Sequence, residues 1–181
     1  MWKNILHVPK RKVEFKNKFS LIFMSSFLNK QSYSSKISLK NIKSVKIGIA
    51  VSEWHPEITE ELFKGAERIL IKNGISKKNI IRKNSPGSFE LPLSAQWLLR
   101  KDKVSAVICL GCVIKGETDH YDYICKTVSK GIMNVSLAHN KPVAFGILTT
   151  HNIKQAGNRA GGKFGNKGEE ATEAVLKMLS M

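Results

Sequence analysis

Apolar positions along the chain alternate between short continuous runs and helix-spaced stripes. The runs predict buried strands at residues 45–52, 105–110 and 143–148, with a weaker one at 79–84. After each run, apolar residues recur every three or four positions, which predicts helices beginning near Pro56, over 89–100 and 121–139, over 153–159, and from Glu169 onward. Repeated strand-then-helix order predicts an α/β fold in which a four-stranded parallel sheet carries helices on both faces.

The stretch 111–120, Gly-Cys-Val-Ile-Lys-Gly-Glu-Thr-Asp-His, follows the third predicted strand and precedes a helix. In parallel sheets, ligands bind where strands end and helices begin, and the free N–H groups of a first helical turn suit an anion. His120 would then stand beside the ligand that this turn holds. The alternative is an ordinary strand-to-helix connection with a surface histidine.

Two other strand ends reach the same edge of the predicted sheet. Trp54 follows the first strand, where its aromatic face could meet a flat ligand or pack in a core or interface. Ser88, Phe89 and Glu90 open the helix after the second strand. Glu90 is favourable there simply as an acid near a helix N-terminus, and ligand contact is the sharper interpretation.

The last third of the chain holds a second candidate for anion binding. Arg159, Lys163 and Lys167 recur every fourth residue within a glycine-rich stretch, 159–168. The glycines disfavour a regular helix there and favour either an anion-binding loop or a basic surface turn. Phe145 lies inside the fourth strand, so core packing is its default role.

Length and motifs narrow the class of protein. A chain of 181 residues fits one domain with a sizeable core, and no apolar run approaches the roughly 20 residues that span a bilayer, so we expect a soluble protein without membrane association. Neither G-x-x-x-x-G-K-[ST] nor G-x-G-x-x-G after the first strand is present, which disfavours a nucleotide-fuelled or nicotinamide-dependent enzyme.

The net charge of +16 is unevenly distributed. Residues 1–46 contain 11 Lys/Arg and one acid, a net +10, which leaves +6 for residues 47–181. We therefore divide the chain into a basic N-terminal arm, 1–44, and a domain, 45–181. The arm is a transit segment, a flexible extension or sequence upstream of the true start. No motif for specific nucleic-acid binding accompanies the charge.

The three cysteines, at 109, 112 and 125, fit a reducing compartment. Cys109 and Cys112 form a C-x-x-C, but no second pair completes a zinc site and Cys109 lies within a strand. Buried small hydrophobic residues are the favoured interpretation, and no metal is expected.

Three blocks resemble one family: 85–92 (Ser-Pro-Gly-Ser-Phe-Glu-Leu-Pro), 111–120, and 145–150 (Phe-Gly-Ile-Leu-Thr-Thr) with 159–168. From about Val45 to its end, the chain resembles the 6,7-dimethyl-8-ribityllumazine synthases. The resemblance implies a flavodoxin-like three-layer sandwich. It also implies a transferase that joins 5-amino-6-ribitylamino-pyrimidinedione to 3,4-dihydroxy-2-butanone 4-phosphate with release of phosphate and water, in riboflavin biosynthesis and without a cofactor.

The resemblance also implies a role for each matching residue. His120 matches the proposed general acid/base. The residues that match the pyrimidine site are Trp54, whose ring stacks, with Ser88, Phe89, Glu90, Cys112, Val113, Ile114 and Phe145, the last contributed across a subunit boundary. Those that match the butanone phosphate site are Glu117, Thr118, Arg159 and Lys163.

Family members are homopentamers, and some assemble into icosahedral shells of 60 subunits. The Gly161-Gly162-Lys163 turn is similar to that of shell-forming members, whereas the long arm is a departure that could alter assembly. A riboflavin synthase is an implied partner. The implied location is the cytoplasm, or a plastid if residues 1–44 are a transit segment.

Two other functions compete with this one. A flavin-like ligand-binding or shell-forming protein of the same fold would need the pocket but no turnover, whereas His120 with Arg159 favours turnover. A nucleic-acid-binding or scaffold protein would use the basic arm, and removal of residues 1–44 would abolish that binding.

Overall fold

A computed structural model describes residues 42–181. Apart from a 3-10 turn, η2 (Ile42–Ser44), the predicted arm lies outside the described residues, and its boundary stays a prediction. Ile42 and Val45 already pack against the core that the first strand begins. Within the described part of the chain, no helix is long and apolar enough to cross a membrane.

The four predicted strands form one parallel sheet in the order β2-β1-β3-β4. The strands are β1 (Ile47–Ser52), β2 (Ile80–Ser85), β3 (Ala106–Ile114) and β4 (Val143–Thr150). Every residue of β1 is buried because helices cover both faces of the sheet, and this explains its continuous apolar run. β2 lies at an edge and is only partly buried, which explains its weaker pattern.

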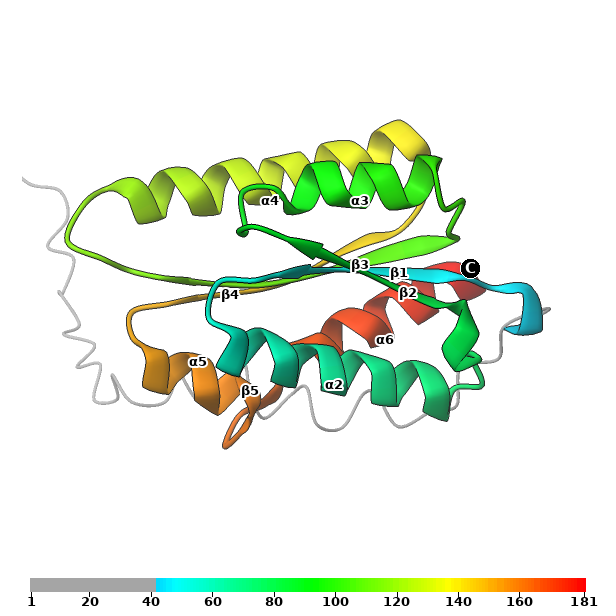
Figure 1. Cartoon of the computed structure of the whole chain (residues 1–181), viewed down its shortest axis with the longest axis horizontal. Coiled ribbons are helices and arrows are strands. Elements are labelled where there is room, and N and C mark those ends of the chain that lie inside the picture. The colour runs from blue at the N-terminus through cyan, green and yellow to red at the C-terminus, as the bar shows by residue number, and fades with distance from the viewer. Residues whose placement is uncertain (1–41) are drawn as a thin grey trace, which may run out of the picture. The chain divides into compact units, whose positions relative to one another are not determined.

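Five helices complete the predicted three layers (Figure 1). α3 (Leu91–Arg100) and α4 (His120–His139) cover one face of the sheet. α2 (Pro56–Lys72), α5 (Ile153–Arg159) and α6 (Lys167–Ser180) cover the other. Two buried apolar clusters lie between these layers, one on each side of the sheet. The predicted flavodoxin-like α/β class is therefore confirmed.

Most element boundaries lie within two residues of the predicted ones, α3 beginning at Leu91 rather than at residue 89, and two segments differ more. β3 continues to Ile114, four residues beyond the expected end, because Gly111 to Ile114 pair with Ile147 to Thr150 of β4. The glycine-rich stretch forms a small hairpin, β5 (Ala160–Gly162) and β6 (Gly165–Asn166). Gly161 and Gly165 have φ of 106° and 84°, a left-handed conformation that glycine adopts without strain.

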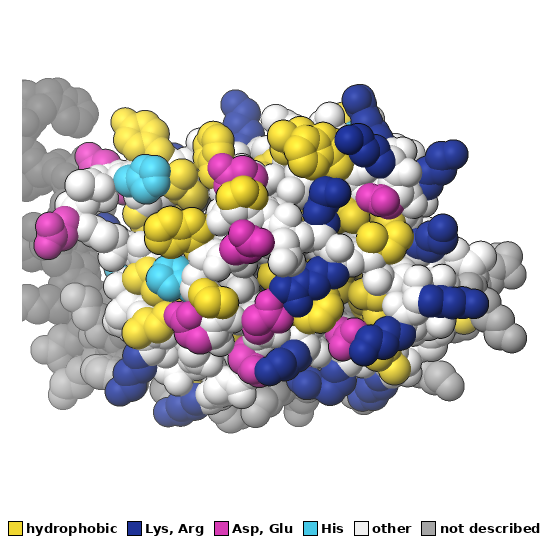
Figure 2. Space-filling model, viewed as in Figure 1, with side chains coloured by type: hydrophobic (Ala, Val, Ile, Leu, Met, Phe, Trp, Pro, Cys, Tyr) yellow, Lys and Arg dark blue, Asp and Glu magenta, His cyan; other side chains and the backbone are white. Residues whose placement is uncertain are grey.

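The carboxyl ends of the strands share one edge of the sheet, where α2, α3 and α4 begin (Figure 1). Figure 2 shows hydrophobic side chains gathered at this end of the visible face, over the starts of α2 and α4. Lys and Arg gather toward the opposite end. The edge that the sequence indicates for ligand binding is thus the less basic end of this face.

Candidate functional site

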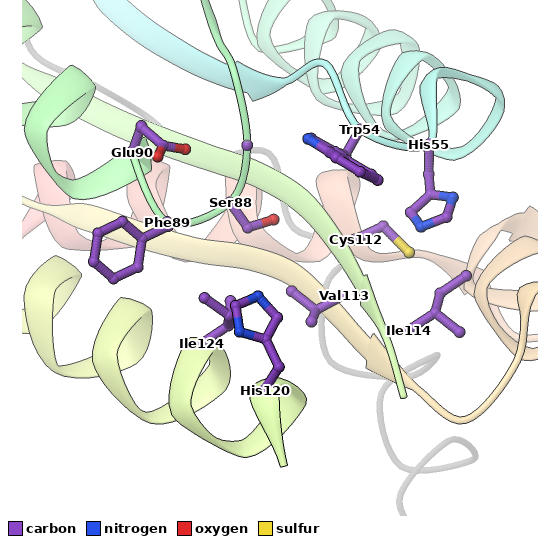
Figure 3. Close-up of a pocket in the computed structure, with 11 residues that line it drawn as sticks. Trp54, His55, Ser88, Phe89, Glu90, Cys112, Val113, Ile114, His120 and Ile124 are labelled. Carbon is purple, nitrogen blue, oxygen red and sulfur yellow. The ribbon is translucent and has the colours of Figure 1, made fainter. Parts of the chain in front are cut away.

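A pocket of about 570 Å³ lies where the sheet order reverses, at the ends of β1 and β3. It brings together the residues after β1, the turn after β2, the end of β3 and the first turn of α4 (Figure 3). Its lining consists of Trp54, His55, Gly87, Ser88, Phe89, Glu90, Cys112, Val113, Ile114, His120 and Ile124. In open α/β sheets this reversal point is the expected place for a ligand.

Trp54 offers the pocket a large aromatic face. It stands in the connection from β1 to α2, its backbone N–H donates to Ser52 Oγ at 3.3 Å, and 67% of the residue is exposed. Its ring meets that of His55 edge to face, with centroids 6.4 Å apart. Because His55 contacts the indole edge to face and most of Trp54 is exposed, the indole can stack on a flat heterocycle.

Ser88 places a buried hydroxyl without a partner in the pocket. The residue is 7% exposed, and no described residue forms a hydrogen bond with its Oγ. A buried polar group without a partner costs free energy, so a ligand atom that bonds to it gains more than it would at a solvated hydroxyl. A Cβ on Gly111 would lie only 2.7 Å from this oxygen, so the glycine leaves room for the hydroxyl.

The end of β3 supplies an apolar floor through Cys112, Val113 and Ile114. Burial, with a smaller contribution from the charge of Glu57, raises the pKa of Cys112 to about 11. Burial raises the pKa of Cys109 to about 12. Both thiols are therefore neutral near pH 7, which agrees with the prediction that they serve as small hydrophobic residues.

His120 is the first residue of α4 and lies across the pocket from Trp54. Figure 3 shows its ring directed toward Ser88, with Ile124, one helical turn later, beside it. The residue is exposed at the mouth of the pocket, so its imidazole is accessible both to solvent and to a ligand bound there. An aromatic face, a hydroxyl and an imidazole thus surround one cavity.

Eight of the predicted site residues line this pocket, and five do not. Glu117 and Thr118 lie in the exposed turn just before α4. Phe145 lies in β4 and packs partly against the core. The guanidinium of Arg159 and the amine of Lys163 lie 5.9 and 5.6 Å from the ring of Phe164, around the β5–β6 hairpin.

Three lining residues were missing from the predicted set: His55, Gly87 and Ile124. The position of Ile124, four residues after His120 on a helix, could have indicated it, because such residues share a face. Gly87 lies beside Trp54, and a Cβ added to this glycine would lie 3.4 Å from the indole. Nothing in the sequence pattern indicates the orientation of His55, which depends on a left-handed backbone conformation.

The described residues contain no group of three or more His, Cys, Asp or Glu side chains that could hold a metal ion. The strand order and the pocket at the reversal point, with the indole of Trp54 on one wall, define a flavodoxin-like α/β protein with a candidate small-molecule site.

Comparison with known proteins identifies the family. The family model for 6,7-dimethyl-8-ribityllumazine synthase matches residues 44–181, and the chain belongs to this family. A 6,7-dimethyl-8-ribityllumazine synthase of Cytophaga hutchinsonii is 59% identical over 152 residues, which are 84% of this chain and 94% of the relative. A synthase of Porphyromonas gingivalis is 48% identical over 77% of this chain and 86% of its own, and one of Limosilactobacillus reuteri is 44% identical over 78% and 91%.

Proposed function

We propose that this chain catalyses the condensation of 5-amino-6-ribitylamino-pyrimidinedione with 3,4-dihydroxy-2-butanone 4-phosphate to give 6,7-dimethyl-8-ribityllumazine, phosphate and water. Membership of the family supports the reaction. The observation that carries the assignment to this pocket is the convergence of Trp54, Ser88 and His120 on one cavity. The reaction needs a stacking face, an anchor for a polar substrate and a group that moves protons, and these three residues have those properties.

The pyrimidine binds between the indole of Trp54 and the floor formed by β3. Ser88 Oγ and the backbone of the turn 88–90 bind polar groups of the ring and ribityl chain, which satisfies the buried hydroxyl. His120 lies across the cavity and exchanges protons with the reacting amine and carbonyl during Schiff-base formation and phosphate loss. No metal or organic cofactor takes part.

The butanone phosphate binds at the turn of Glu117 and Thr118, where the first N–H groups of α4 favour an anion. Arg159 and Lys163 supply positive charge to this phosphate. Because Phe145, Arg159 and Lys163 lie outside the pocket of their own chain, we assign them to the pocket of a neighbouring subunit.

An oligomer, a homopentamer by family resemblance, would provide that neighbour. α3 and α4 expose large apolar side chains on one layer of the molecule: Leu93, Trp97, Tyr123, Met133 and Leu137. Such a surface is typical of a subunit interface rather than of an isolated molecule in water. Assembly into a 60-subunit shell and binding of a riboflavin synthase are further expectations, as is a cytoplasmic location.

The experiment that tests the function mixes the purified full chain with both substrates and follows lumazine fluorescence together with free phosphate. We expect equimolar formation of both products well above the rate without protein. Binding of the pyrimidine with no product above that background would refute the synthase and leave a binding protein.

A mixing experiment tests the shared pocket. His120→Ala and Arg159→Ala chains are coexpressed and their mixed oligomers compared with either variant alone. If His120 and Arg159 reach one pocket from different subunits, some mixed pockets contain both native residues and activity partly recovers. Activity no higher than that of the single variants would place both residues in the same chain's pocket.

A further inference from the structure

His55 is the second imidazole of the pocket, on the wall opposite His120. It adopts a left-handed backbone conformation, with φ of 57° and ψ of 58°, which costs conformational free energy for a residue with a Cβ. The conformation turns the chain from β1 into α2. It also directs the imidazole toward the end of β3, beside Cys112 (Figure 3).

Helix capping does not explain this arrangement. The carbonyl oxygen of His55 accepts hydrogen bonds from the N–H groups of Ile58 and Thr59 at 2.9 and 3.0 Å, but its side chain makes no capping hydrogen bond. Glycine or asparagine would satisfy the backbone with less strain. The imidazole is therefore not needed for the helix cap.

The contacts of the ring indicate what that role is. Nδ1 lies 3.6 Å from Glu57 Oε1, so the carboxylate faces this nitrogen. With a proton on Nδ1 directed at Glu57, Nε2 can accept a hydrogen bond. No group in the described residues forms a hydrogen bond with Nε2. The ring also touches the indole of Trp54 edge to face, so it borders the position of a heterocycle stacked on that indole.

We propose that His55, held by Glu57, is a specificity-determining residue whose Nε2 accepts a hydrogen bond from a ring N–H of the pyrimidinedione stacked on Trp54. The inference rests on the proposed function for the identity of the ligand. His120 and His55 lie on opposite walls of the pocket. A ring bound with its amine toward His120 would therefore present its other edge to His55. It does not take part in the chemical step, and Glu57 acts through it as a positioning residue.

Calorimetric titration with two probes tests the proposal: the pyrimidinedione, and an analogue methylated on the ring nitrogen between its carbonyls. His55→Gly removes the imidazole but keeps a residue suited to the left-handed turn. We expect its Kd for the pyrimidinedione to rise about 3- to 10-fold, the loss of one net hydrogen bond. The native chain should discriminate against the methylated analogue, and His55→Gly should not.

Lys103→Gly is the matched control, because Lys103 has a similar φ of 53° in the exposed loop between α3 and β3 and does not line the pocket. It should bind both probes as the native chain does. An unchanged Kd in His55→Gly, or discrimination that persists in it, would overturn the proposal.

A variant of Glu57 separates positioning from direct contact. Glu57→Gln should weaken binding, and His55→Gly with Glu57→Gln should bind no more weakly than His55→Gly alone. Additive losses would contradict a role of Glu57 through His55. If the native chain forms no lumazine from the two substrates, the proposed function is refuted. The titrations of the native chain and His55→Gly would still test the role of His55 in binding.

Discussion

Because Gly111 lies close to Ser88, substitutions at these two positions should change the free energy of unfolding and the affinity for the pyrimidine in different ways. An added Cβ at Gly111 would lie 2.7 Å from Ser88 Oγ, 3.1 Å from Leu91 Cδ1 and 3.4 Å from Ile147. The first distance requires the serine to move, and the second leaves little room for it to do so. Gly111→Ala should therefore lower the free energy of unfolding by about 1–3 kcal/mol, as insertion of a methyl group into a packed core does.

Ser88→Ala should have the opposite effect on stability. It removes a buried hydroxyl that has no partner among the described residues, so the unliganded protein should gain about 1 kcal/mol while its affinity for the pyrimidine falls. Combined with Gly111→Ala, it removes the closest contact of the new Cβ. The double variant should therefore be more stable than Gly111→Ala alone.

Denaturant and thermal unfolding at one fixed protein concentration measure these effects, because dissociation of an oligomer makes the midpoint depend on concentration. At this chain length, 1 kcal/mol corresponds to about 2–4 °C in Tm. Gly116→Ala is the matched control, since its Cβ would meet nothing within 4 Å. Equal stability of Gly111→Ala and Gly116→Ala, or no recovery in the double variant, would refute the packing argument.

Three further predictions concern stacking, charge and pH. Trp54→Ala should raise the Kd for the pyrimidine about 5- to 100-fold through loss of stacking, with Trp54→Phe much closer to native; equal effects of both would contradict a stacking role. Arg159→Ala should raise the KM for the butanone phosphate at least about tenfold and leave the pyrimidine Kd unchanged; weakening of both substrates alike would argue against a phosphate contact. Burial raises the folded-state pKa of Cys112 to about 11 and that of Cys109 to about 12, so folding favours the neutral thiols. The stability that these two thiols contribute is complete below their unfolded pKa near 9 and is lost as the pH rises toward 11 and 12. Unfolding between pH 8 and 11 should show this loss, reduced in Cys112→Ala, and an identical pH dependence in that variant would exclude Cys112 as a source.

The layers of the fold follow from local patterns in the sequence. Helical spacing and the positions of Pro56 and Pro92 indicate where α2 and α3 begin, and the apolar runs indicate all four strands. The end of β3 could not be predicted in this way, because the pairing of Gly111 to Ile114 with β4 is a long-range interaction that overrides the turn preference of glycine. The β5–β6 hairpin is also unexpected, since its glycines suit several turns equally.

The sequence predicts those site residues that directly follow a strand. Residues directly after parallel strands meet at one edge, which is why the sequence alone groups Trp54, Ser88 and His120. His55 could not be placed there, because its orientation depends on a φ that histidine seldom adopts. Arg159 does not line the pocket, because it ends α5, which follows the edge strand β4, and no local pattern specifies that strand order.

We propose that His120 moves protons in the pocket that Trp54 and Ser88 form. A single-turnover experiment tests it most directly: protein saturated with the pyrimidine is mixed with butanone phosphate, and lumazine formation is followed in the native chain and in His120→Ala. We expect a rate about 100- to 1,000-fold lower in the variant, with a pyrimidine Kd within about twofold of native. An unchanged rate, or a loss of rate that only mirrors a loss of pyrimidine binding, would contradict it.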